Sequence, residues 1–211
     1  MLEITMSRSV EAGSLRGQDE PGFLTSVIKR LFAGLKYLSP LAWLERFRPN
    51  ITPTTVEWYV LICLFLEFIA AINVTKIVGW ASWQQRVILA LAAIKILEII
   101  RVTASVALFD EGVVASIQRT LILAAINFLE LGLCFGFFYA LNKELLEGDG
   151  VGALTGFYFS FITQLTIGFG DIHPIGWLCI VAVIQGLTAA LFVLLVFGKI
   201  VASLRPLQSD K

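Results

Sequence analysis

The chain contains four long runs of apolar residues, and the length of each matches the thickness of a lipid bilayer. They lie at roughly 56–78, 87–108, 121–141 and 177–201. A helix needs about 20 mostly apolar residues to cross the hydrocarbon core. The composition agrees, because 57% of the residues are hydrophobic and only 15% are charged, whereas a soluble chain has about 45–50% and about 25%. The sequence therefore predicts a multi-pass α-helical membrane protein.

A shorter apolar segment, 153–166, lies between the third and fourth runs and is too short to span. We expect a re-entrant half-helix there. It leads directly into the sequence Thr166-Ile-Gly-Phe-Gly170, which is followed by Asp171 and Pro174. Irregular backbone at membrane depth is tolerated only where protein covers it or where it lines a water-filled path. A glycine-rich turn without an ion-related role is the alternative, but such a turn has no other reason to exist at this depth.

With this motif and its flanking helices, residues from about 119 to 203 resemble the pore module of tetrameric potassium channels. That module consists of an outer helix, a pore helix, a selectivity filter and an inner helix. The resemblance implies an all-α membrane protein with four transmembrane helices, a re-entrant pore helix and an extended filter, assembled as a homotetramer around a central pore. It also implies passive conduction of K⁺ as the permeant ion, with no organic cofactor.

In such a filter, backbone carbonyls replace the hydration shell of the ion. The predicted ligands are the carbonyls of Thr166, Ile167, Gly168 and Phe169, together with the Thr166 hydroxyl. Gly168 and Gly170 permit the alternating backbone angles that this needs, because they have no Cβ. The side chains of Ile167 and Phe169 are expected to point away from the axis and to pack against the pore helix.

The resemblance also implies supporting residues. Asp171 is expected to form a hydrogen bond behind the filter, Phe157 and Tyr158 match the aromatic positions around it, and Thr163 is a further support. The chain departs from the family pattern at Phe169, where tyrosine is usual, and at Ile162, Gln164 and Leu165. Two other functions therefore stay open: a weakly selective cation channel, and a non-conducting regulatory subunit with a vestigial pore.

Two weaker signals lie in the helices. Gly186, midway along the last run, is either a gating hinge or a site of close helix packing.

Charged residues interrupt the first three runs, and they are expensive to bury in a membrane. Lys95, Glu98 and Arg101 share one helix face. Structural ion pairs are favoured over a voltage sensor, because this face has only two cations with an acid between them. The candidate partners for these cations are Glu67 and Glu130.

The remaining parts of the chain complete the expected organisation. Residues 1–21 are expected to be disordered, and 22–50 form a basic amphipathic helix that lies on the membrane and contacts anionic lipid, or else packs on a cytosolic partner. Residues 51–112 hold two additional spans, 113–203 the pore module and 204–211 a short tail. Lysine and arginine concentrate on one side of the predicted spans, which places both termini in the cytoplasm of a plasma-membrane protein.

Other classes are disfavoured by the same sequence. The net charge of +0 gives no basic surface for nucleic acid. No nucleophile–base pair, carboxylate dyad or phosphate loop stands out, so an enzyme is not expected. With one histidine and no Cys/His cluster, a dedicated metal site is not expected either. His173, just after the motif, is either an ordinary loop residue or a group that makes conduction pH-dependent.

Overall fold

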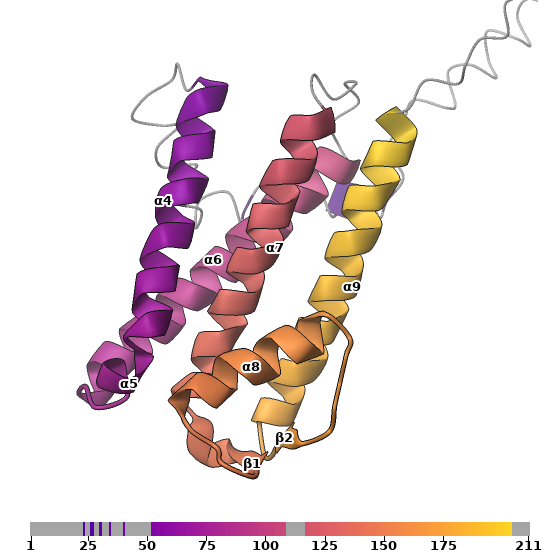
Figure 1. Cartoon of the computed structure of the whole chain (residues 1–211). Coiled ribbons are helices and arrows are strands. Elements are labelled where there is room, and N and C mark those ends of the chain that lie inside the picture. The colour runs from indigo at the N-terminus through magenta and orange to yellow at the C-terminus, as the bar shows by residue number, and fades with distance from the viewer. Residues whose placement is uncertain are drawn as a thin grey trace, which may run out of the picture. The chain divides into compact units, whose positions relative to one another are not determined.

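The computed structural model describes residues 52–108 and 117–203, together with six isolated helical positions (23, 26, 27, 30, 34 and 40). Apart from these positions, the segments expected at 1–21, 22–50 and 204–211 lie outside the described residues, and so does the predicted lipid contact of the N-terminal helix. The chain divides into two compact units, Met1–Gly34 and Leu35–Lys211. The second unit holds all the helices and strands labelled in Figure 1.

Within the described residues, four long helices alternate in direction along the chain (Figure 1). They are α4 (Pro53–Ile72), α6 (Ser82–Leu108), α7 (Ile117–Ala140) and α9 (Leu178–Ser203), and a short α5 (Val74–Ile77) follows α4. Thr52 caps the start of α4, where its side chain accepts a hydrogen bond from the Thr55 N–H. Three helices (α4, α7 and α9) are long and apolar enough to cross a membrane. The chain is therefore an all-α membrane protein.

Helix α6 corresponds to the second predicted span and differs from the others in composition. Its 27 residues are long enough to cross a bilayer. It also contains Arg86, Lys95, Glu98 and Arg101, and it does not reach the apolar character of the three helices above. Lys95 and Glu98 are buried against neighbouring helices. The fourth span therefore stays a prediction, supported by the length of α6 and by the burial of these charges.

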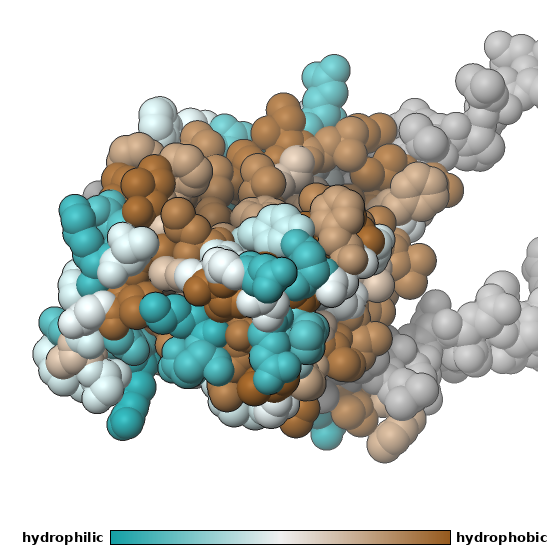
Figure 2. Space-filling model, turned by 60° about the horizontal axis from the view of Figure 1, so that its bottom comes forward, coloured by the Kyte–Doolittle hydropathy of each residue, from teal (hydrophilic) through white to brown (hydrophobic). Residues whose placement is uncertain are grey.

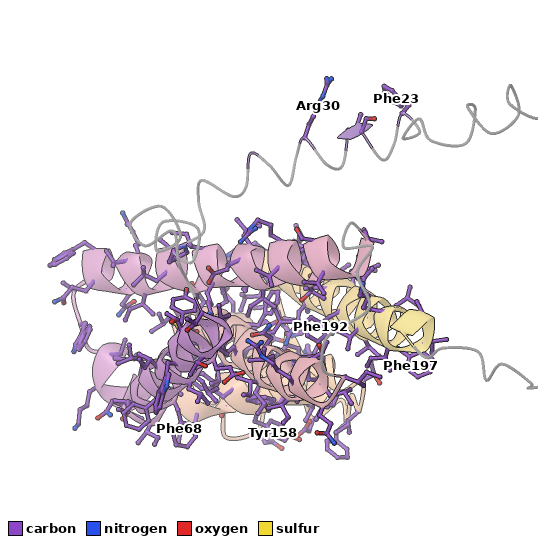
Figure 3. All side chains as sticks on the ribbon, turned by 90° about the horizontal axis from the view of Figure 1, so that it is seen from above. Phe23, Arg30, Phe68, Tyr158, Phe192 and Phe197 are labelled. Atoms are coloured by element: carbon purple, nitrogen blue, oxygen red, sulfur yellow. The ribbon has the colours of Figure 1, made fainter. Side chains whose placement is uncertain are left out.

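Helix α7 lies at the centre of the unit and packs against α4, α6, α9 and the short helix α8 (Ala153–Gln164). Figure 3 shows Phe192 of α9 pointing inward, and its ring lies 5.6 Å from that of Phe128 on α7. Phe68 and Phe197 point outward from α4 and α9, and they are 54% and 64% exposed. Outward aromatic and aliphatic side chains of this kind suit contact with lipid or with another subunit.

The α7–α8 contact depends on three glycines that the sequence analysis did not single out. A Cβ placed on Gly132 would lie 2.6 Å from the Phe161 ring. A Cβ on Gly136 would overlap the Phe157 ring, and one on Gly156 would overlap the backbone of Ala140. The four-residue spacing of Gly132 and Gly136 is the small-residue signal that could have predicted this contact. These glycines let α8 lie directly on the α7 backbone.

We expect Gly156→Ala to destabilise the fold by about 1–3 kcal/mol, because overpacking strains a close contact and the backbone of Ala140 cannot rotate away. Thermal unfolding in detergent, followed by helical circular dichroism, measures the effect. Gly198→Ala is the matched control, since no described residue lies within 4 Å of its Cβ position and alanine favours a helix. Equal melting temperatures for Gly156→Ala and the wild type would contradict this prediction. They would show that α7 and α8 can move apart to accept the added methyl group without a loss of stability.

A two-stranded antiparallel ribbon connects the two ends of the α8 region. The all-α prediction did not include this ribbon. It pairs β1 (Leu146–Gly148), preceded by the short helix η2 (Lys143–Leu145), with β2 (Ile172–Pro174). Hydrophilic residues gather at this end of the molecule, and hydrophobic helix surfaces surround them (Figure 2). The ribbon end is therefore suited to face water.

Candidate functional site

The glycine motif lies in the loop that runs from the C-terminal end of α8 to β2 (Figure 1). Backbone hydrogen bonds attach the start of this loop to the last turn of α8. The Ile162 carbonyl accepts the N–H groups of Ile167 (2.8 Å) and Gly168 (3.4 Å), and the Thr163 carbonyl accepts that of Thr166 (3.1 Å). The loop therefore begins at a position that α8 determines.

The backbone of this loop alternates in conformation. Thr166, Gly168 and Gly170 have positive φ angles of 56°, 57° and 80°. Glycine adopts this region readily, whereas a β-branched residue such as threonine is strained there. Such strain persists only where the surroundings impose it, and it is typical of functional segments. The sequence predicted the two glycine positions, but it did not predict that the alternation extends back to Thr166.

The carbonyl oxygens of the loop are available to a ligand. Among residues 52–108 and 117–203, no donor forms a hydrogen bond with the carbonyl of Thr166, Ile167, Gly168 or Phe169. An apolar environment makes such groups costly unless water or an ion satisfies them. The loop thus presents a row of oxygens with the chemistry that binds a hard monovalent cation.

A family model described as "Ion channel" (Ion_trans_2) matches residues 127–205. Residues 127–205 are therefore similar to the ion-channel family. The match covers α8, the loop, α9 and most of α7, so the predicted resemblance of 119–203 to a channel pore module is confirmed at the level of the family. No curated protein and no solved structure matches the chain. Helices α4 and α6 lie outside the matched segment.

Behind the glycine motif, a hydrogen bond joins α8 to the loop. The Tyr158 hydroxyl donates to Asp171 Oδ2 at 2.8 Å, a contact of the kind that the resemblance implied for Asp171. This bond to a carboxylate raises the pKa of the Tyr158 phenol above its ordinary value. The phenol is the donor in this bond and the carboxylate is the acceptor. The bond ties the outer end of the loop to α8, as the Ile162 carbonyl ties the inner end.

Two other residues expected to support the filter, Phe157 and Thr163, have different surroundings from each other. Phe157 was expected to surround the filter, but it packs against α7, where its ring makes an edge contact with Phe137 at 5.1 Å. The cause is the close α7–α8 contact at Gly136, which makes room for this ring. Thr163 is partly exposed, and its carbonyl, rather than its side chain, bonds to the loop.

Ile167 and Phe169 were expected to pack against the pore helix, and this is not what the single chain shows. Their side chains are 49% and 68% exposed. The loop follows the edge of the subunit, so its own α8 cannot cover both of its sides. The side chains of Ile167 and Phe169 therefore form an exposed apolar surface on the single chain.

His173 and Gly186 also have defined surroundings. Nε2 of His173 lies 3.2 Å from Oε2 of Glu147 across the ribbon, and both side chains are more than half exposed. Gly186 lies within α9, and nothing lies within 4 Å of its Cβ position among the described residues. A tight contact of Gly186 within its own subunit is therefore not observed, and its role as a hinge stays a prediction.

The charges inside the helices form a cluster rather than a row. Lys95 Nζ lies 3.4 Å from Glu98 Oε2 and 3.4 Å from Glu130 Oε2, which confirms Glu130 as its predicted partner. Tyr59 of α4 donates to the same oxygen of Glu98 at 2.8 Å. Glu67 does not pair with a described cation; its Oε1 lies 3.6 Å from the Cys134 Sγ, which donates to it. This cluster connects α4, α6 and α7, as expected for a structural ion pair.

Proposed function

We propose that the chain is a subunit of a potassium-selective channel, in which K⁺ passes along the carbonyls of Thr166, Ile167, Gly168 and Phe169. The observation that carries this proposal is the combination of alternating positive φ angles at 166, 168 and 170 with carbonyls that no donor among the described residues occupies. Alternation directs successive carbonyls to a common side, where their oxygens can replace the hydration shell of an ion. Gly170 and the Thr166 hydroxyl complete the two ends of the site.

The assembly that fits this role is a homotetramer. One loop supplies one column of oxygens, and an ion in the membrane needs oxygens on all sides. The exposed side chains of Leu165, Ile167 and Phe169 are then covered by neighbouring subunits. A closed ring with fourfold symmetry satisfies both requirements with identical interfaces.

The pore helix contributes electrostatically to the same path. The C-terminal end of α8 lies just before Thr166, and its helix dipole places partial negative charge there. No acidic residue stands in the last turn of α8, where a fixed charge would hold a cation too firmly. A helix end gives a weaker attraction that favours a cation and still allows it to leave.

The direction of the helices is consistent with a cytoplasmic location for both termini. The start of α4 and the end of α9 lie at the same end of the unit, opposite the ribbon and the loop (Figure 1). The excess of lysine and arginine in the segments at that end places it in the cytoplasm. The filter and the hydrophilic ribbon then face the outside of a plasma membrane.

A weakly selective cation channel is the second candidate, and two observations favour it. Gln164 and Leu165 replace residues that usually support the filter, and Leu165 is 53% exposed. In addition, Phe169 has no hydroxyl with which to form a hydrogen bond behind the filter. A less firmly held ring would discriminate less between K⁺ and Na⁺.

A flux assay in liposomes tests the proposal. Purified protein is reconstituted in liposomes with K⁺ inside and Na⁺ outside, and no valinomycin is added. A membrane-potential dye then reports the voltage that K⁺ creates when it leaves through the protein. We expect a negative interior that collapses when external K⁺ replaces Na⁺. A dye signal that is the same for K⁺ and Na⁺ gradients would support the second candidate. Single-molecule bleaching of labelled subunits should show four steps, and any other number would contradict the tetramer.

A further inference from the structure

A buried hydrogen-bond network joins the inner helix to the pore helix, and it is not part of the filter itself. Its centre is Gln185 of α9, which has 0% exposed surface. The Gln185 amide nitrogen donates to the Ser160 carbonyl at 2.9 Å and to the Ser160 hydroxyl at 2.8 Å, with Gln164 Oε1 at 3.4 Å. Its amide oxygen accepts the Tyr139 hydroxyl of α7 at 2.9 Å. One side chain thus contacts two other helices.

The network continues beyond Gln185 and ends on the backbone of α7. The Ser160 hydroxyl donates to the Gly132 carbonyl at 2.7 Å, and Gln164 Nε2 donates to the Phe128 carbonyl at 2.6 Å. Ser160 and Gln164 are 0% and 3% exposed. Helix α8 is therefore held from α9 on one side and from α7 on the other, at two successive turns.

The position of these contacts connects them to ion conduction. Gln164 is two residues before Thr166, and Ser160 and Gln164 flank Ile162, whose carbonyl holds Ile167 and Gly168. A shift of the last α8 turn by a fraction of an ångström would move the inner end of the filter by a similar amount. Buried hydrogen bonds in an apolar setting are strongly orienting, because breaking one leaves an unsatisfied group.

We propose that Gln185 is a positioning residue that fixes the outer half of α9 to the last turns of α8 and thereby holds the inner end of the selectivity filter at Thr166. This rests on the proposed function. It assigns Gln164 a definite role as well, because this departure from the family pattern is the acceptor and donor through which α8 is tied to both neighbours. Gly186 follows Gln185 directly, so a bend of α9 at that glycine would move the inner half of the helix and leave the network in place.

The test compares the K⁺-to-Na⁺ permeability ratio and the melting temperature of four reconstituted proteins. They are the wild type, Gln185→Leu, the double variant Gln185→Leu/Tyr139→Phe and the control Gln118→Leu. The control makes the same chemical change at an exposed position of α7. We expect Gln185→Leu to lower the permeability ratio about tenfold, the size of effect that a lost buried partner produces, and Gln118→Leu to leave it unchanged.

The double variant separates positioning from general stability. Removing the orphaned Tyr139 hydroxyl together with the Gln185 amide is expected to recover part of the melting temperature, because Tyr139 then no longer leaves a buried hydroxyl without an acceptor. The permeability ratio should stay low, since Ser160 and Gln164 still lack their donor. It also provides a folded protein if Gln185→Leu alone does not assemble.

Two results would overturn the role of Gln185. One is a wild-type permeability ratio in Gln185→Leu or in the double variant; the other is recovery of the ratio in step with the melting temperature. A wild type and a Gln118→Leu control that both fail to discriminate K⁺ from Na⁺ would instead overturn the proposed function, and the positioning role with it. The control arms thus distinguish the two failures.

Discussion

Replacing Gly168 with alanine should abolish selective K⁺ conduction. Gly168 has a φ of 57°, which an L-residue adopts at a cost of about 1–2 kcal/mol. In a ring of four subunits the cost is on the order of 4–8 kcal/mol, enough to lower K⁺ current by more than about a hundredfold. A rotated peptide at 168 would turn its carbonyl away from the ion path. Single-channel recording of reconstituted protein measures the effect.

Gly150 offers a matched control for this variant. It has a φ of 70°, and as at Gly168 no described residue lies within 4 Å of its Cβ position. It lies before α8 and outside the filter loop, so Gly150→Ala introduces the same backbone strain without touching a carbonyl column. We expect normal K⁺ current from it. Equal currents from Gly168→Ala and Gly150→Ala would show that the carbonyls near 168 do not contact the ion.

The largest effect on stability is expected from Lys95→Met. Lys95 is buried between Glu98 and Glu130, at 3.4 Å from each. Removing one member of a buried ion pair costs about 3–5 kcal/mol, because a charge is left without compensation. Glu98 keeps the Tyr59 hydroxyl as a donor. Among the described residues Lys95 is the cation paired with Glu130, and no other donor forms a hydrogen bond with either Glu130 oxygen, so Glu130 is the carboxylate that is left without compensation.

This identifies the variant that should restore stability. Lys95→Met/Glu130→Gln removes the isolated carboxylate and should recover a large part of the melting temperature in detergent. Lys95→Met/Glu98→Gln should recover less. Lys76→Met, at an exposed lysine, serves as the control and should melt like the wild type. If Lys95→Met/Glu98→Gln melted at a higher temperature than Lys95→Met/Glu130→Gln, the charge of Lys95 would be compensating mainly Glu98.

The helices and the alternating backbone of the glycine loop were predictable because each depends on a local pattern. Runs of about 20 apolar residues fix the existence of a span, and the glycine spacing in Thr166-Ile-Gly-Phe-Gly170 fixes where the backbone can alternate. The structure gives α8 the range Ala153–Gln164, against a predicted pore helix in the segment 153–166. Asp171 and Lys95 also contact partners of the type expected from their chemistry.

The contacts that depend on how helices pack against one another were not predictable in this way. Phe157 and Tyr158 are adjacent in an aromatic pair, but successive residues on a helix point in different directions, so one faces α7 and the other faces Asp171. Gln185 is one polar residue in an apolar run, and the sequence around it does not indicate which neighbouring helix its side chain contacts. Its partners Ser160 and Tyr139 lie 25 and 46 residues away.

The reversal potential in a planar bilayer, with K⁺ on one side and an equal concentration of Na⁺ on the other, tests the central claim most directly. The carbonyl column at 166–169 predicts a reversal potential far from zero. Its sign is that of the K⁺ gradient, because K⁺ flows out of the side that contains it. A current that reverses near zero would contradict a K⁺-selective filter at these residues.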